Sequence, residues 1–306
     1  MSRPLVILFG PTAVGKTELV ARLAASFPAL EIVNADSMQV YRHLDIGTAK
    51  PSAALRRAIP HHLIDIVDPD VQFDAGQFVR LAEEAVEAVR ARGGLPVLCG
   101  GTAYYLRSFI CGLAQAPASD PRIRGQLKDE LERRGLAALL DELSRVDPAT
   151  RAAVAERDAY RVLRALEVHR ATGRPLSSFA NPDQPRADYA FLTLGLERER
   201  VELYRRIDLR VERMFEEGLA AEVAGLLAQG YGPQDPGMRG IGYREFFLMR
   251  QGCWTLSDLR EAIQRNSRRY AKRQITFFKS LPGVEWLPAA RPEELVGRIE
   301  RFFAAS

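Results

Sequence analysis

The residues best suited to chemistry near the start of the chain form a glycine-rich segment, Gly10-Pro11-Thr12-Ala13-Val14-Gly15-Lys16-Thr17. This segment fits the pattern G-x-x-x-x-G-K-[ST], which occurs where a buried strand leads into a helix. The apolar run Leu5–Phe9 predicts the strand, and the helix is predicted by the spacing of Leu19, Val20, Leu23 and Ala24. In such a setting backbone N–H groups attract an anion, Lys16 adds a positive charge, and the Thr17 hydroxyl can bind Mg²⁺. The segment therefore predicts a phosphate-binding loop, although the pattern does not identify the phosphate compound.

Two further polar residues directly follow predicted strands. Asp36 comes after Glu31–Ala35, and Thr102 comes after Leu95–Cys99 and two glycines. Parallel strands end at the same edge of a sheet, so we expect both residues to lie near the phosphate loop. Asp36 could act as a general base or sit beside a metal ion, or it could only cap a turn or helix. Thr102 could likewise present its hydroxyl to a reacting centre, or only cap the next helix.

A basic segment near the other end of the chain suggests a polyanionic partner. Between Arg239 and Lys279 the chain has ten Lys and Arg residues and three acids, a net charge of +7, whereas the whole chain carries +4. No acid follows Glu261 in this segment, which predicts uncompensated repulsion on a helix. The basic side chains of this helix are Arg265, Arg268, Arg269, Lys272 and Arg273. The pattern suits contacts to a phosphate backbone, with Gln274 reading a base edge, although a solvated helix face is the ordinary alternative.

The order of the predicted elements indicates an α/β protein. The strands alternate with helices, such as the amphipathic stretch Asp74–Arg92, and this order predicts a parallel sheet with helices on both faces. From Pro117 the pattern is helical without a convincing strand, until Tyr189–Leu196 predicts a returning strand. The remainder is expected to be helical, in Arg205–Ala228 and Ser257–Phe278. We therefore expect a P-loop-type core formed by residues 1–116 and 189–306, with an α-helical insertion at 117–188.

Composition excludes several classes of protein. Of the 306 residues, 47% are hydrophobic and 27% are charged, which is ordinary for a globular protein in water. No apolar run is long enough to span a membrane, and the chain does not begin with a signal peptide, so we expect a cytoplasmic protein without a membrane partner. Cys99, Cys111 and Cys253 lie far apart and form no metal-binding pair. His61-His62 also lacks ligand-spaced partners, which argues against a metal site there.

Successive segments of the chain resemble the signatures of one family, the bacterial tRNA dimethylallyltransferases, or isopentenyltransferases. The phosphate loop is the first of these segments. The others are Asn34–Tyr41, Asp45–Pro51, Pro60–Asp65, Gly100–Tyr105, Arg161–Val168, Arg239–Arg244 and Tyr270–Gln274. They follow the family's order from residue 10 to about residue 279, and generic enzymes with a phosphate loop lack the later segments.

The resemblance implies an enzyme, a prenyltransferase that requires Mg²⁺. It would transfer a dimethylallyl group from dimethylallyl diphosphate to the exocyclic amine of the tRNA adenosine on the 3′ side of the anticodon, and release diphosphate. Gly10–Thr17, with Lys16, would hold the donor diphosphate, and Arg206 would bind the diphosphate as it leaves. Asp36 would accept the proton of the amine, and Thr102 would help to position that amine.

The resemblance also implies which residues contact tRNA, with the helical insertion clamping the anticodon stem-loop. These residues are Asp36, Ser37, Met38, Gln39, Thr102, Arg124, Tyr160, Arg161, Val162, Leu163, Arg164, Arg239, Gly240, Ile241, Gly242, Tyr243, Arg244, Lys272, Arg273, Gln274, Phe277 and Lys279. Phe277 stands where relatives often carry Trp, which keeps a stacking surface but loses the indole N–H. We expect a monomer, because no separate apolar stripe suggests an interface.

Two other functions explain part of the sequence. An ATP-dependent small-molecule kinase would use the phosphate loop and Asp36, but it leaves the insertion and the basic segment unexplained. The sequence also has no aspartate directly after Leu95–Cys99, where such a kinase would need one, because Gly100 follows. A non-catalytic RNA-binding module would explain the basic helix but not a complete phosphate loop beside Asp36.

Overall fold

The computed structural model describes residues 2–179, 182–252 and 254–304, so Cys253 lies outside the described residues. The chain divides into two compact units, one formed by Met1–Cys111 and Gln184–Ser306 and the other by Gly112–Asp183. The first unit contains all the strands named below and is the α/β core. The second is helical. In the part of the chain that the structure describes, no helix is both long and apolar enough to cross a membrane.

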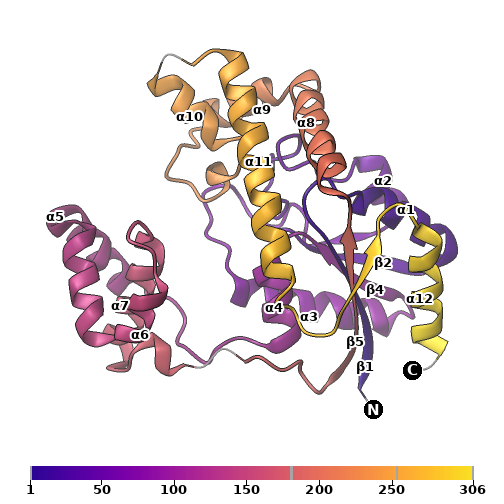
Figure 1. The fold of residues 1–306 in the computed structure, drawn as a ribbon, viewed down its shortest axis with the longest axis horizontal. Helices are drawn as coiled ribbons and strands as arrows, with labels where there is room; N and C mark the ends of the chain where they lie inside the picture. Colours follow the sequence, from indigo (N-terminus) through magenta and orange to yellow (C-terminus); the bar gives the residue numbers. More distant parts are fainter. Residues whose placement is uncertain (1, 180–181, 253, 305–306) are drawn as a thin grey trace. The chain divides into compact units, whose positions relative to one another are not determined.

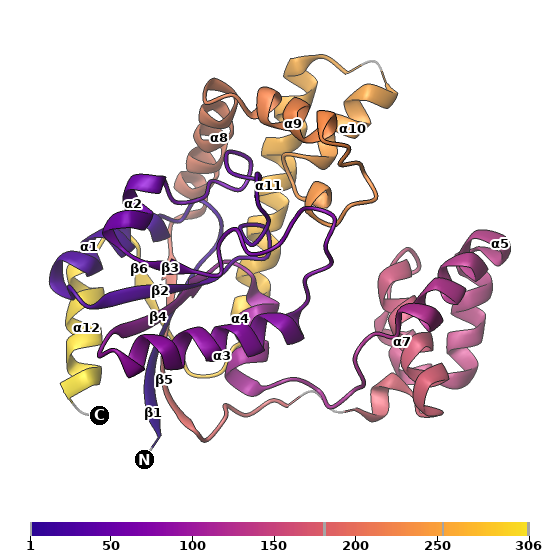
Figure 2. The same ribbon diagram turned by 180° about the vertical axis from the view of Figure 1, so that it is seen from behind.

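The core unit is built on a six-stranded parallel sheet with the strand order β3-β2-β4-β1-β5-β6 (Figures 1 and 2). The strands are β1 (Arg3–Phe9), β2 (Leu30–Ala35), β3 (His61–His62), β4 (Leu95–Gly100), β5 (Tyr189–Glu197) and β6 (Val284–Pro288). The predicted α/β fold with a parallel sheet is confirmed. Because β1 lies between β4 and β5, the phosphate loop that follows β1 leaves the centre of the sheet, where neighbouring strand ends flank it.

Helices cover both faces of the sheet because alternate strand residues point to opposite sides. On one face, apolar side chains of the strands share a core with α1 (Lys16–Ser26) and α12 (Pro292–Ala304). On the other face, Phe109 of α4 (Ala103–Cys111) packs on Phe191, with ring centroids 6.4 Å apart. Phe278 packs on Phe9 of β1 on that same face, at 4.5 Å. The helix predicted at 74–92 is α3 (Ala75–Ala91), and its side-chain cap Asp74 accepts the N–H of Gln77.

The part of the core that follows β5 differs from the prediction. One helix was expected at 205–228, but the structure has α8 (Arg200–Glu216) and α9 (Leu219–Ala228), separated by Gly218 at φ +102°. A left-handed residue cannot continue a right-handed helix, so the chain turns there. The predicted basic helix is α11 (Leu256–Phe278), which lies beside α8 (Figures 1 and 2). The expectation that the remainder is helical is wrong at β6. The other elements of the core are α2 (Ala53–Ala58), η2 (Gly237–Arg239) and α10 (Arg244–Gln251).

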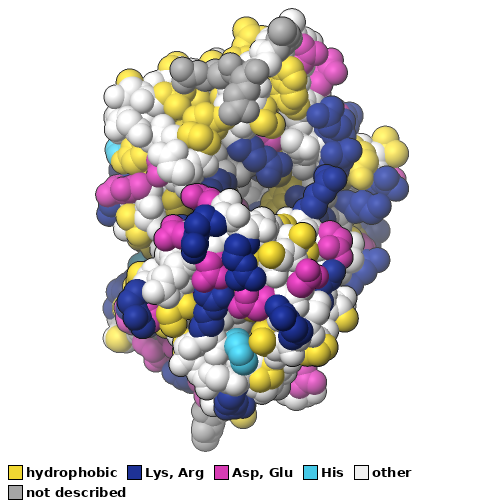
Figure 3. Space-filling model, turned by 90° about the vertical axis from the view of Figure 1, so that its left-hand side faces the viewer, with side chains coloured by type: hydrophobic (Ala, Val, Ile, Leu, Met, Phe, Trp, Pro, Cys, Tyr) yellow, Lys and Arg dark blue, Asp and Glu magenta, His cyan; other side chains and the backbone are white. Residues whose placement is uncertain are grey.

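The helical unit has its own apolar core, formed by side chains of α5 (Pro121–Val146) and α7 (Ala159–Thr172). The shorter elements α6 (Pro148–Ala153) and η1 (Leu176–Ser178) complete it, and α5 bends at Gly135, where φ is +75°. Arg170 links Glu130 and Glu142 across the helices at 2.7 and 2.8 Å. Figure 3 shows basic and acidic side chains interspersed on the surface.

The helical unit begins and ends five residues earlier than the predicted 117–188. Backbone hydrogen bonds explain the second boundary: Arg186 donates to Ile110, and Arg3 donates to Asp188. Both bonds attach the segment before β5 to the core, although that segment is not itself a strand.

Candidate active site

The phosphate loop has the strand–loop–helix geometry that its sequence predicts. The loop leaves β1 at Phe9, and α1 begins at Lys16. Two loop residues adopt left-handed backbone conformations, Ala13 at φ +62° and Gly15 at φ +112°. Alternation of left- and right-handed residues turns successive N–H groups towards one concave side, and such nests bind anions.

Lys16 is folded over the loop. Its ammonium group donates to the carbonyl oxygens of Gly10 at 2.8 Å and Pro11 at 3.2 Å. Burial lowers the pKa of Lys16, and the nearby Arg210 lowers it further, whereas interactions with Cys99 and the Asp36 carboxylate oppose the shift. A partly desolvated cation in this place interacts strongly with an anion, because little water remains to screen the charge. Thr17, the residue predicted to bind metal, is exposed at the start of α1.

Asp36 and Thr102 lie together at the ends of β2 and β4. The Asp36 carboxylate accepts the backbone N–H of Met38 at 2.9 Å. The Thr102 hydroxyl accepts the N–H of Ser37 at 2.8 Å and donates to the Ser37 hydroxyl at 3.1 Å. Asp36 therefore stabilises a turn, which is the structural role that its sequence position allowed. This bond occupies one carboxylate oxygen, and the side chain is not buried. Thr102 directs its hydroxyl to the Asp36–Ser37 turn.

Three arginines after β5 surround the phosphate loop, and the sequence identified only Arg206. Arg206 donates to the carbonyl oxygen of Ala13 at 3.0 Å and pairs with Glu18 at 2.9 Å. Arg198 donates to the carbonyl oxygen of Val14 at 3.2 and 3.3 Å. Arg210 reaches further in, to the Thr12 hydroxyl at 3.1 Å. Burial lowers the pKa of Arg210, against the opposing charge of Asp36.

Gln274 of α11 corrects a prediction. We expected this side chain to read an RNA base, but it is buried and both ends of its amide are bonded to the core. Its oxygen accepts the N–H of Thr12 at 2.9 Å, and its nitrogen donates to the carbonyl oxygen of Gly101 at 2.7 Å. Burial raises the pKa of Tyr270, one helical turn earlier, and the neighbouring side chains of Thr102 and Gln274 oppose this shift. One face of α11 is therefore part of the candidate active site.

Tyr243, predicted to contact tRNA, is fully buried and belongs to a structural network. Its hydroxyl donates to the carboxylate of Glu222 at 2.6 Å. Glu222 also accepts the backbone N–H groups of Asp45, Ile46 and Gly47 at 2.7 to 3.1 Å. A Cβ atom at Gly47 would lie 2.5 Å from the Tyr243 ring, so two separate sequence motifs meet in this network. Gly240 and Gly242 are buried too, Ile241 is half-buried, and the side chains of Arg239 and Arg244 are exposed.

The residues predicted to contact RNA from the helical unit separate into two groups. Val162 and Leu163 are buried in the core of that unit, which argues against contact with RNA. Tyr160 is 62% exposed, and the guanidinium of Arg124 lies 5.0 Å from its ring centroid. The exposed Arg161 and the half-buried Arg164 also lie on α7, where Arg164 pairs with the buried Glu167 at 3.0 Å. An exposed aromatic ring beside arginines is a surface on which a base can stack.

The basic side of α11 is partly compensated, contrary to the prediction from sequence. Arg268 forms an ion pair with Asp208, and Arg260 pairs with Glu212 at 3.0 Å, so α8 supplies the missing acids. Several other side chains of the helix and its end are exposed, namely Arg265, Arg269, Lys272, Arg273 and Lys279. Phe277 is half-buried beside them. The remaining predicted contacts, Ser37, Met38 and Gln39, are half-buried next to Asp36.

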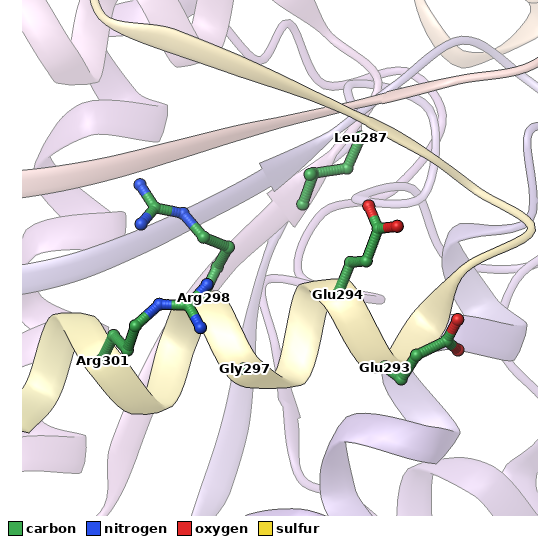
Figure 4. A pocket seen from close by; sticks show the side chains of 6 residues that line it. All are labelled: Leu287, Glu293, Glu294, Gly297, Arg298 and Arg301. Carbon is green, nitrogen blue, oxygen red and sulfur yellow. The ribbon is translucent and has the colours of Figure 1, made fainter.

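Two other features lie apart from this site. His62 bonds to Glu31 at 2.8 Å and His61 to the carbonyl oxygen of Ile59 at 2.6 Å, and among the described residues no group of three His, Cys, Asp or Glu side chains could hold a metal ion. A pocket beside α12, shown in Figure 4, is lined by Leu287, Glu293, Glu294, Gly297, Arg298 and Arg301. It shares no residue with the phosphate loop or with α8.

The chain is similar to known proteins along most of its length. The family model described as IPP transferase matches residues 39–281. A tRNA dimethylallyltransferase of Geobacter sulfurreducens is 49% identical over 287 residues, which are 92% of this chain and 91% of the relative. The crystal structure of a full-length tRNA isopentenylpyrophosphate transferase from Bacillus halodurans has a TM-score of 0.72 and 36% identity, covering 100% of this chain and 98% of that one. A eukaryotic dimethylallyltransferase acting on tRNA gives a TM-score of 0.78 at 29% identity, covering 94% of this chain and 74% of that one.

Proposed function

Since this chain belongs to the IPP transferase family, we propose that it transfers a dimethylallyl group from dimethylallyl diphosphate to tRNA. The acceptor is the exocyclic amine of the adenosine on the 3′ side of the anticodon, and diphosphate is released. Similarity to tRNA dimethylallyltransferases over nine-tenths of the chain supports this activity. Since the substrate is tRNA, the enzyme would act in the cytoplasm, and we propose that it does so as a monomer.

The proposal for the reaction rests on the position of Asp36 near Lys16 and Arg210. Asp36 lies at the same sheet edge as the phosphate loop and interacts electrostatically with both Lys16 and Arg210. A donor diphosphate in the loop would therefore have cations on one side and a carboxylate near its reacting carbon. This arrangement suits a substitution in which an anion leaves and a proton is lost from the nucleophile.

The proposed reaction forms one bond and breaks another at the allylic carbon. The amine nitrogen bonds to this carbon, and the carbon–oxygen bond breaks with its electron pair passing to diphosphate. The amine proton passes to the carboxylate of Asp36. Lys16 and Arg210 stabilise the departing charge, and Arg198 and Arg206 hold the loop through the carbonyl oxygens of Val14 and Ala13. Removing one preorganised donor of this kind from an enzyme typically costs about 2.7–4 kcal/mol of transition-state stabilisation.

The loop fits a Mg²⁺ ion that the substrate itself helps to bind. Mg²⁺ commonly takes few protein oxygens and completes its shell with water and substrate phosphates. The exposed hydroxyl of Thr17 would hold the ion against the diphosphate, and the ion would neutralise part of the leaving charge.

The acceptor RNA would bind along the exposed cations of α11, among them Lys272 and Arg273. The target base must leave the RNA stack to reach Asp36 at the sheet edge, as enzymes that act on a base require. The exposed Tyr160 and Arg161 of the helical unit offer a second contact to the same RNA.

The test uses purified protein stripped of nucleotide, with tRNA, Mg²⁺ and labelled dimethylallyl diphosphate. We expect labelled tRNA without ATP, because the loop amides and Lys16 recognise a diphosphate regardless of the group attached to it. ATP should only compete for the loop. Strict dependence of the product on ATP hydrolysis would refute the assignment and favour a kinase.

A further inference from the structure

Gln274 is an unusual residue for a basic, RNA-facing helix, because it is polar yet only 4% exposed. It directly follows the exposed Arg273 and lies two residues after the exposed Lys272. Its side chain points away from these cations, into the core, and bonds to Thr12 of the phosphate loop and to Gly101 after β4. A single amide therefore joins α11 to two strand ends of the catalytic unit.

The geometry of this contact is selective for glutamine. The amide offers an acceptor to the Thr12 N–H and a donor to the Gly101 carbonyl oxygen at the same time. A carboxylate would place a second acceptor against the Gly101 oxygen, and an apolar side chain would satisfy neither group. A Cβ atom at Gly101 would lie 2.8 Å from the Gln274 amide nitrogen, so a side chain there would displace this amide.

The contact extends to the other half of the site. Tyr270 lies next to both Gln274 and Thr102, and the Thr102 hydroxyl accepts the N–H of Ser37 in the Asp36 turn. Displacement of α11 would thus move the donor loop and the turn of the general base together. Chains of packed side chains and hydrogen bonds can carry coupling between two sites when both ligands bias one element.

We propose that Gln274 is a positioning residue that couples the docking of RNA on α11 to the binding of diphosphate in the loop. RNA on Lys272 and Arg273 fixes the helix, and the helix fixes the Thr12 end of the loop through the Gln274 amide. Each ligand therefore raises the affinity for the other by the same factor. The inference rests on the function proposed above.

The test is a thermodynamic cycle with inorganic diphosphate and an anticodon stem-loop RNA. Diphosphate affinity is measured by calorimetry in Mg²⁺, with and without saturating RNA, for the wild type and for Gln274→Met, which keeps the length and loses both hydrogen bonds. We expect the RNA to tighten diphosphate binding at least about fivefold in the wild type, the lower end of typical coupling. In Gln274→Met the RNA should change the affinity for diphosphate by less than about twofold, because the coupling is lost.

Gln264→Met is the matched control, because this glutamine lies on the same helix and bonds to Glu212 at 2.9 Å instead of to the loop. It should keep the wild-type coupling. Gln274→Glu provides a second readout: a protonated carboxyl restores the donor to Gly101, so coupling should recover as the pH falls from about 8 to about 5.5. A merely structural glutamine would not show this recovery.

Three results would overturn the inference. Coupling that survives in Gln274→Met would show that another contact carries it. A wild type that binds both ligands independently would refute coupling while leaving the proposed function intact. A wild type that binds neither diphosphate nor the RNA would refute the proposed function, and this inference with it.

Discussion

Replacement of Asp36 by Asn should nearly abolish transfer while the site remains folded. Asn keeps an oxygen that can accept the Met38 N–H, now bonded at 2.9 Å, so the turn after β2 should persist. It cannot accept a proton at neutral pH, and loss of a general base typically costs about 10²–10⁴-fold in rate. At about 1.4 kcal/mol for each tenfold, the transition state would lose roughly 3–5 kcal/mol of stabilisation.

The same change should leave diphosphate binding unweakened, which separates catalysis from folding. Asp36 is an opposing charge beside Lys16 and Arg210, so its removal leaves two cations less compensated and more attractive to an anion. The assay is single-turnover transfer of labelled dimethylallyl groups, with diphosphate affinity measured in parallel. Asp36→Ala serves as the matched variant, because it should lose the rate and, in addition, about 1 kcal/mol of stability from the missing turn bond. If Asp36→Asn reacted within a few-fold of the wild-type rate, Asp36 would be a turn residue only and the mechanism would be wrong.

Three further predictions concern the supports of the site and the RNA surface. Gly47→Ala should lower the thermal unfolding midpoint, because its Cβ would meet a buried tyrosine ring at 2.5 Å, whereas Gly125→Ala, in open space, should raise it slightly. Lys272→Gln should reduce the log–log salt slope of tRNA binding by about 0.7–0.9, and Arg268→Gln, which removes a charge already paired with an acid, should change it less. Arginine contacts lower the pKa of Glu130 to about 2, so this carboxylate stabilises the fold above about pH 4.3, its unfolded value, and the stabilisation is lost as the pH falls towards 2. Glu130→Gln should therefore destabilise the helical unit at pH 7 and have little effect near the acid limit, as measured by hydrogen exchange.

The residues that could be predicted from sequence are those whose function depends on neighbours in the chain. The phosphate loop, Asp36 and Thr102 each follow a short apolar strand, and parallel strands bring such positions to one edge. The same argument predicted β1, β2, β4 and β5 to within two residues. It failed for β6, a short edge strand that is only half-buried and ends in Pro288, because such a segment has little alternation of apolar residues.

The residues that could not be predicted depend on how helices rotate about their axes. The segment after β5 is rich in arginine, and its sequence does not show that Arg198 and Arg210 face the loop while Arg205 faces solvent. Gln274 was assigned to RNA because cations precede it, but the packing of α11 turns it inward. The acids that compensate Arg260 and Arg268 lie on a different helix, which a count along one segment cannot include.

The charge arrangement of the site is compatible with the proposal that a loop typical of nucleotide enzymes binds a prenyl donor. Lys16 and Arg210 lie within the site, Arg198 and Arg206 brace the loop from outside, and Asp36 is the carboxylate that interacts with the inner pair. These groups recognise a diphosphate and contain nothing that distinguishes the group attached to it. Selectivity for the attached group must then come from the side of Asp36 and Thr102, where the acceptor amine would also lie. Because α11 contacts both sides through Tyr270 and Gln274, the element that presents cations to RNA also shapes the space in which donor and acceptor meet. A phosphate loop alone therefore indicates a phosphate-containing ligand, and the residues packed against the loop must determine which ligand and which reaction.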